Sequence, residues 1–286
     1  MTRTRLLAAS VMAPVAIAAV LLLPTPWMAV VSAAMFLIGL WEWLKLAEID
    51  DPIARSVLLV VNLLLIVALV WASRSATGGS LILFKLMTML GVIWWLLAVI
   101  WLRHYSFASD HDTHARMFKL AAATLSVVPA WCALVYIHSG GETADASAAA
   151  EGPRWLMLAL AIVWAADSGA YFAGRRFGRT KLSPRISPNK TVEGLLGGVV
   201  AGMVLALAAA PFAGASVKQL PAVAIVAIWT ILFSVVGDLY ESLLKRHVGA
   251  KDSGNLIPGH GGVLDRIDSV LAALPVFALG KLLFGF

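Results

Sequence analysis

Charged residues stand at both ends of a polar stretch between the last two apolar segments of the chain. Asp238, Ser242 and Lys245 are spaced so that they share one face of a helix. Asp265 and Asp268, at the start of the last apolar segment, also share a face. Carboxylates from two helices make a hard oxygen site, which suits a Mg²⁺ ion that takes its other ligands from phosphates.

The residues between these carboxylates supply groups that bind phosphate. Basic side chains can neutralise phosphate oxygens, and the glycines of the PGHGG run let the backbone approach an anion at the start of the last helix. Together these groups indicate nucleotide or diphosphate chemistry. The alternative is that the basic residues only anchor a helix end at the lipid headgroups. The candidates are Lys245, Arg246, Lys251, His260, Gly261, Gly262 and Arg266.

A second polar stretch, residues 174–192, follows an apolar segment that contains Asp167. A carboxylate at membrane depth is costly and normally faces a bundle interior or a wet cavity. Six basic residues lie in the stretch, where Asn189 can cap a helix and Lys190 can meet a phosphate. The alternatives are a structural hydrogen bond for Asp167, anionic lipid for the basic run, and an ion pair between Lys190 and Glu193.

The composition requires a membrane to position these residues. The 286 residues are 60% hydrophobic and only 13% charged, with a mean hydropathy of +0.88. Soluble domains carry about 25% charged residues, so this composition excludes a soluble domain.

The single cysteine, Cys132, cannot form an internal disulfide. The net charge of +6 is interpreted by position, since basic residues report membrane orientation first, and no nucleic-acid partner is expected.

Apolar runs long enough to span a bilayer, about 20 residues each, recur along the whole chain. We therefore predict an all-α polytopic integral membrane protein with about nine transmembrane helices. Residues 1–150 would hold about five spans, and residues 151–286 a catalytic region with two polar loops. The predicted spans are residues 6–23, 27–45, 56–73, 81–102, 118–138, 154–173, 193–212, 220–241 and 264–285.

The distribution of charge predicts the orientation. With the N-terminus in the cytoplasm and alternating spans, 17 of the 22 basic residues lie on the cytoplasmic side. This asymmetry is what the positive-inside rule expects. Both polar stretches then face the cytoplasm and can build one site.

The stretch from Ser242 to Asp268 resembles the signature of the bacterial phosphatidate cytidylyltransferase family, whose members are also called CDP-diglyceride synthases. The ISPNKTVEG and ADSGAYFAGRRFGR runs resemble the other cytoplasmic segment of that family. The likeness is strong from about residue 160 to 285 and general before residue 150. The matching positions are Ser242, Lys245, Arg246, Lys251, Asp252, Gly254, His260, Gly261, Gly262, Asp265, Arg266 and Asp268.

The resemblance implies a reaction and its partners. CTP and phosphatidic acid would give CDP-diacylglycerol and pyrophosphate, with Mg²⁺, in a homodimeric enzyme of the bacterial inner membrane. It implies metal binding at Asp238 and Asp265, and a place for K⁺ beside the magnesium without assigned ligands. We expect Asp268 to assist the metal site, and Lys190 with the other basic residues to neutralise phosphates.

Three other functions remain open on the residues alone. A CTP-dependent polyprenol or phytol kinase and an intramembrane prenyltransferase use related chemistry, whereas a transporter or lipid-binding scaffold would consume no CTP. The remaining polar features are interpreted as structural. Glu42 lies between two tryptophans near a helix end, as is usual at a membrane interface, although the alternative is that it serves a substrate cavity. The loop with His104, His111 and His114 is interpreted as solvated, although a zinc site is the alternative.

Overall fold

The computed structural model describes residues 2–73, 80–141, 146–257 and 261–286. Within these ranges the chain forms nine long α-helices, one short 3-10 helix and one β-hairpin. The elements are α1 (Thr2–Leu22), α2 (Thr25–Leu46), α3 (Pro52–Ala72), α4 (Ile82–Arg103), α5 (Thr113–His138), α6 (Ala146–Phe177), β1 (Lys181–Ser183), β2 (Ser187–Thr191), α7 (Val192–Ala213), η1 (Val217–Gln219), α8 (Leu220–His247) and α9 (Leu264–Phe284).

Capping side chains mark the start of α3 and α5. Asp51 precedes α3 and accepts a hydrogen bond from the backbone N–H of Ile53 at 2.9 Å. Asp112 caps α5 through the N–H of Ala115 at 2.7 Å. These side chains satisfy donors that the first turn of a helix leaves unpaired. In a bilayer the rest of the backbone must pair internally, which is why the apolar segments are helical.

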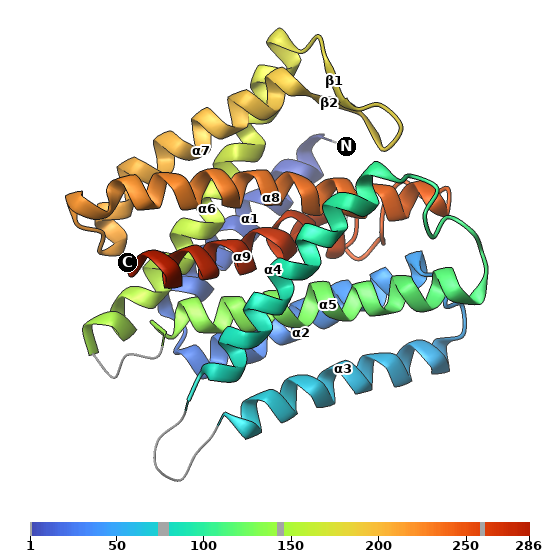
Figure 1. The fold of residues 1–286 in the computed structure, drawn as a ribbon, viewed down its shortest axis with the longest axis horizontal. Helices are drawn as coiled ribbons and strands as arrows, with labels where there is room; N and C mark the ends of the chain where they lie inside the picture. The colour runs from blue at the N-terminus through green and yellow to red at the C-terminus, as the bar shows by residue number, and fades with distance from the viewer. Residues whose placement is uncertain (1, 74–79, 142–145, 258–260) are drawn as a thin grey trace.

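The predicted fold class is confirmed. Within the described residues, eight helices are long and apolar enough to cross a membrane. Each of the nine predicted spans coincides with a helix, but α1 contributes only a shorter apolar stretch, Ser10–Leu22. The number of passes, and with it the side of the membrane on which each terminus lies, stays a prediction. Figure 1 shows the N-terminal and C-terminal ends of the chain toward opposite ends of the bundle.

The core contains residues from both halves of the chain. Tyr240 of α8 is fully buried, with its ring 5.6 Å from that of Trp43 on α2 and 5.6 Å from that of Trp95 on α4. The indole N–H of Trp43 donates to the backbone of Lys119 on α5, and that of Trp95 to Leu271 on α9. Because these aromatic side chains lock α2, α4 and α8 together, the end of α2 lies beside the last two helices.

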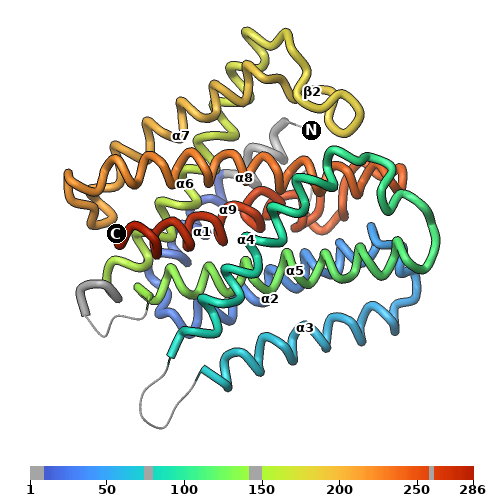
Figure 2. Tube along the Cα trace, viewed as in Figure 1, coloured from blue at the N-terminus to red at the C-terminus, as the bar shows by residue number. Residues whose placement is uncertain are grey.

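Two regions project from this core. α7 runs along the upper edge of Figure 1 and packs on α6, and small buried residues at every fourth position of α7 allow their close approach. α3 lies on the outside of the bundle, as the tube in Figure 2 shows, and most of its side chains are exposed.

The β-hairpin and residues 248–257 lie at the same end of the bundle as the N-terminus (Figure 1). β1 and β2 are antiparallel, with Lys181 opposite Thr191 and Ser183 opposite Ser187. Both polar stretches are therefore at one end, as the alternation of spans predicted. That this end faces the cytoplasm stays a prediction.

Candidate active site

A pocket of about 600 Å³ lies between α6, the hairpin, α7 and α8. It lies where the second polar stretch meets α8, and its walls include the apolar side chains of Leu182, Leu195 and Val235. The polar residues that line it are Asp167, Tyr171, Arg175, Ser187, Asn189, Lys190, Thr191 and Asp238. Asp167, Asn189 and Lys190, predicted from the second polar stretch, thus lie together with Asp238 of the first.

One ion pair joins the hairpin to α8. The ammonium of Lys190, on β2, lies 2.5 Å from Oδ2 of Asp238. The alternative pair between Lys190 and Glu193 is not formed, because the Glu193 carboxylate accepts hydrogen bonds from the backbone N–H groups of Arg179 and Thr180 at 3.0 and 3.2 Å. The Glu193 carboxylate therefore binds the backbone just before β1, whereas the Lys190 side chain lines the pocket and pairs with Asp238.

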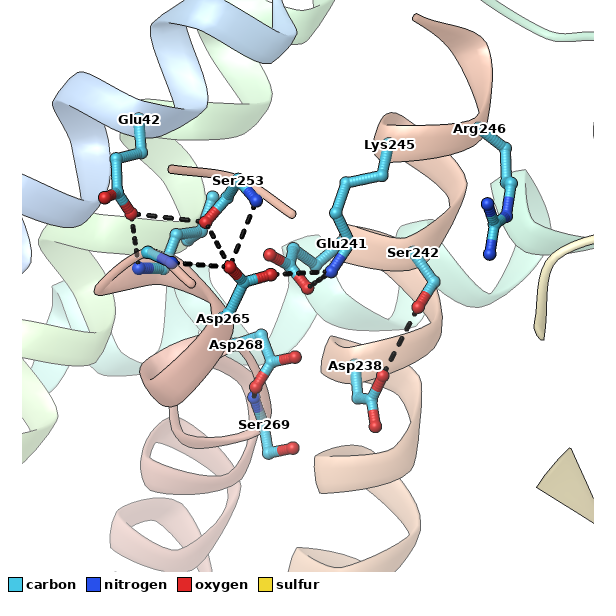
Figure 3. A network of polar contacts seen from close by, with 12 residues as sticks. Glu42, Asp238, Glu241, Ser242, Lys245, Arg246, Ser253, Asp265, Asp268 and Ser269 are labelled. Atoms are coloured by element: carbon cyan, nitrogen blue, oxygen red, sulfur yellow. Dashed lines mark hydrogen bonds and ion pairs between the residues drawn. The ribbon is translucent and has the colours of Figure 1, made fainter. Parts of the chain in front are cut away.

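Carboxylates from three helices surround this ion pair. Asp167 of α6 and Asp268 of α9 both interact electrostatically with Asp238 and with Lys190. Figure 3 shows the Asp268 side chain in the space between α8 and α9, beside Asp238. Carboxylates of α6, α8 and α9 are thus near the Lys190 ammonium, and Arg175 lines the same pocket.

A second ion-pair network joins α8 to α9. Nζ of Lys245 lies 2.6 Å from Oε2 of Glu241 and 2.8 Å from Oδ1 of Asp265 (Figure 3). The Glu241 side chain is only 2% exposed. Glu241 was not among the residues predicted from the sequence, although its position one turn before Lys245 was the available signal.

Asp265 accepts hydrogen bonds from the polar loop as well. Its Oδ2 accepts from the backbone N–H and the hydroxyl of Ser253, both at 3.0 Å, and from the N–H of Gly262 at 2.8 Å. Glu42, interpreted from the sequence as an interfacial residue, instead contacts this loop: its Oε2 accepts from the Ser253 hydroxyl at 3.2 Å. Ser253 was not predicted from the sequence, and Glu42 contacts the polar loop, which the interfacial interpretation did not anticipate.

The remaining predicted residues occupy less central positions. The Ser242 hydroxyl donates to Asp238 at 3.4 Å, and the guanidinium of Arg246 donates to the backbone carbonyl of Ile186 at 3.2 Å, which ties α8 to the hairpin. Lys251 and Arg266 are exposed, while Gly261 and Gly262 directly precede α9. The prediction for His260 falls outside the described residues.

A comparison with known families decides the family. The model of the cytidylyltransferase family matches residues 3–284 of this chain. The chain belongs to the cytidylyltransferase family.

Similar proteins cover nearly the whole chain. It is 34% identical to the phosphatidate cytidylyltransferase of Haemophilus influenzae, over 97% of this chain and 98% of that protein. It is 37% identical to the phosphatidate cytidylyltransferase of Pseudomonas aeruginosa, over 97% of this chain and 96% of that protein. The Bacillus subtilis phosphatidate cytidylyltransferase is 47% identical over 43% of this chain.

The donors of this cytidylyltransferase fit a magnesium ion that is completed by substrate. Among the described residues, no three His, Cys, Asp or Glu side chains form a group that could hold a metal ion by themselves. Magnesium needs only one or two carboxylates, since it retains waters and takes phosphate oxygens. Asp238 already pairs with one cationic group, the ammonium of Lys190.

The histidine-rich loop has a structural role where it is described. Asp112 caps α5, and His111 lies 2.5 Å from Oε1 of Glu48. The Glu48 carboxylate also pairs at 3.4 Å with Lys119, whose side chain is fully buried. Burial acts to raise the pKa of Glu48, but its hydrogen bonds with His111 and Lys119 and the charge of Lys119 lower the pKa overall. This cluster stabilises the join between α2 and α5.

Proposed function

We propose that this protein transfers CMP from CTP to phosphatidic acid, giving CDP-diacylglycerol and pyrophosphate. The observation that carries the proposal is its similarity, along 97% of its length, to two proteins named phosphatidate cytidylyltransferase. The geometry supports it. A polar pocket at one end of an apolar bundle offers charged groups where a water-soluble nucleotide and a lipid headgroup can meet.

The reaction is an in-line displacement at phosphorus. An oxygen of the phosphatidate phosphate attacks the α-phosphorus of CTP, a new P–O bond forms, and the bond to the bridging oxygen breaks so that pyrophosphate leaves. The attacking group is already anionic, so no strong general base is needed. The obstacle is the approach of two polyanions, and the enzyme lowers it with positive charge and positioning.

Basic residues from both polar stretches supply that charge. Lys190 pairs with Asp238 at the pocket, and we propose that a substrate phosphate takes up Lys190 when it binds. Lys245 is held between Glu241 and Asp265, so that its ammonium is oriented before substrate arrives. The other phosphate-binding groups proposed are Arg246, Lys251 and Arg266, with His260, Gly261 and Gly262 at the triphosphate and Ser242, Asn189 and Asp167 as further substrate contacts.

We propose Asp238 and Asp265 as the residues that hold Mg²⁺, with Asp268 assisting. When bound, the ion reduces the charge of the triphosphate and polarises the phosphoryl group as a Lewis acid. Asp238 faces the pocket and Asp265 lies at the start of α9. A K⁺ ion beside the magnesium is part of the same proposal, on the family resemblance.

The surroundings of the site are proposed from topology. The helices establish a multi-pass membrane protein, and we place it in the bacterial inner membrane with its site facing the cytoplasm. Acyl chains would enter from the side of the bundle while CTP enters from water. We also propose a homodimer, on the family resemblance.

The test uses purified protein in detergent with labelled CTP, phosphatidic acid and Mg²⁺, beside an Asp265→Asn variant. We expect labelled CDP-diacylglycerol and pyrophosphate from the wild type, loss of product in the variant, and loss of product when the metal is chelated. Phosphorylation of a polyprenol or phytol in place of CDP-lipid formation would overturn the proposal in favour of a kinase. No consumption of CTP with any acceptor would contradict an enzyme of this class.

A further inference from the structure

Glu42 is a buried carboxylate in the last turn of α2, in the half of the chain where the family signature is weakest. Its residue is only 4% exposed. The ion pairs found among the described residues do not include it. Burying a carboxylate costs free energy unless hydrogen-bond donors surround it. The donors that bind Glu42 therefore indicate its role.

Those donors belong to the polar loop and to the start of α9. Oε2 of Glu42 accepts from the backbone N–H of Leu264, the first residue of α9, at 2.7 Å, and from the Ser253 hydroxyl at 3.2 Å. The partners are 222 and 211 positions away in the sequence. Glu42 therefore caps the N-terminus of α9, the last helix of the chain. The helix dipole also favours a negative charge at this position.

The loop is shaped to receive this carboxylate. A Cβ atom built at Gly254 would collide with Oε1 of Glu42, and one built at Gly262 would collide with Oε2. Both glycines belong to the stretch that resembles the family signature. Their lack of a side chain is explained by the close approach of Glu42, so the carboxylate and the loop fit each other.

The same loop fixes Asp265. The Ser253 hydroxyl lies between the two carboxylates, 3.2 Å from Glu42 and 3.0 Å from Asp265 (Figure 3). The N–H groups of Ser253 and Gly262 also donate to Asp265. Loss of the Glu42 contacts would thus loosen the segments around Ser253 and Leu264, whose neighbouring N–H groups orient Asp265.

We propose that Glu42 is a positioning residue for CMP transfer, which holds the loop around Ser253 and the start of α9 so that Asp265 faces the site. This inference rests on the proposed function for its catalytic readout. It gives the N-terminal half of the chain a direct part in building the active site. Groups that orient a functional carboxylate typically change activity by about 10- to 100-fold when they are removed.

The test compares Glu42→Gln with Glu48→Gln. Glutamine keeps the size of each side chain and removes its charge, and Glu48 stands near the same end of α2 but contacts His111 and Lys119 instead of the loop. We expect kcat/KM for CTP to fall by about 10- to 100-fold in Glu42→Gln. Glu48→Gln should lose thermal stability but keep a kcat/KM within about threefold of the wild type when assayed below its Tm.

A double-mutant cycle distinguishes positioning from general stabilisation. If Glu42 acts through Ser253, the Glu42→Gln/Ser253→Ala double variant should lose little more activity than the worse single variant, because the two changes break one network. A purely structural role predicts that the two losses multiply, and that result would overturn the proposal. If Glu42→Gln does not fold, Gly254→Ala displaces the carboxylate without removing its charge and should give a similar loss of activity.

Hydrogen exchange provides a readout that does not depend on turnover. In protein without CTP, Glu42→Gln should accelerate exchange at residues 251–257 and 261–265, while Glu48→Gln should not. If the wild type makes no CDP-diacylglycerol, the proposed function fails, and the exchange data alone decide whether Glu42 holds the loop. If the wild type is active and Glu42→Gln matches it in kcat/KM and in exchange, only the positioning role is refuted.

Discussion

The α8–α9 side of the site and the α6–α7 side differ in how completely their charges are paired. On the first, Asp265 is 8% exposed at its side chain, and both its oxygens accept hydrogen bonds. On the second, the Asp238 side chain is 31% exposed, and the pocket beside it contains the exposed Asp167 and Asn189. The first side is organised before substrate arrives, whereas the second exposes polar groups that a substrate can engage.

The largest expected effect tests the organised side. Asp265→Asn should reduce the rate of CDP-diacylglycerol formation by about 100-fold or more, because the amide cannot accept all of the donors that now converge on the carboxylate. The measurement is the initial rate with labelled CTP. Asp50→Asn, an exposed change in the loop after α2, is the control and should keep the wild-type rate. Equal rates for the two variants would contradict the assignment of Asp265 to the site.

A smaller effect is expected on the open side. Lys190→Met should raise KM for CTP by about 10- to 100-fold, since a charge-assisted hydrogen bond contributes about 1.5–3 kcal/mol. Lys190→Arg keeps the charge and should retain more affinity than the methionine variant. The measurement is steady-state kinetics at varied CTP. An unchanged KM would show that Lys190 only holds the hairpin to Asp238.

The spacing between α8 and α9 provides a third test. A Cβ at Gly237 would collide with the backbone carbonyl of Asp268, so Gly237→Ala should push the two helices apart. We expect a destabilisation of about 1–3 kcal/mol, typical of overpacking, together with a fall in kcat because Asp238 is the next residue. Thermal unfolding in detergent and the rate assay measure the two effects. A variant with wild-type Tm would contradict the close approach.

The smallest effect lies outside the site and depends on pH. The pKa of Glu48 is lowered in the folded protein, so its ionised form stabilises the fold above the ordinary pKa of a glutamate, and this contribution is lost as the pH falls through the lowered value. The difference in Tm between the wild type and Glu48→Gln should be largest near about pH 7 and shrink toward about pH 4. A difference that grows on acidification would refute the role of the Glu48 charge.

The sequence predicted most of the fold because the bilayer leaves few choices. Apolar runs must be helical, and proline and capping residues mark their ends, as Asp51 and Asp112 show. The local part of the site was also predictable: Asp238, Ser242 and Lys245 share a helix face, and their partners Asp265 and Asp268 begin the next helix.

Contacts between distant segments were not predictable from spacing. The pairing of Lys190 with Asp238, and of Glu42 with Ser253 and Leu264, depends on which helices pack together, and helical periodicity carries no such information. The available signal for Glu42 was a glutamate within an apolar helix, which calls for a partner. The partner itself could only be identified once Tyr240 and Trp43 were seen to place α2 beside α8.

The contact between Glu42 and Leu264 has a consequence for synthesis. The ribosome makes the two residues 222 positions apart, which at bacterial and eukaryotic rates separates them by on the order of ten to forty seconds. During that interval α2 can insert, but its carboxylate has neither Ser253 nor Leu264 to accept from. The site can close only after the last helix has emerged, so a chain that stops before α9 would carry Glu42 without the N–H of Leu264 and would lack the arrangement around Asp265.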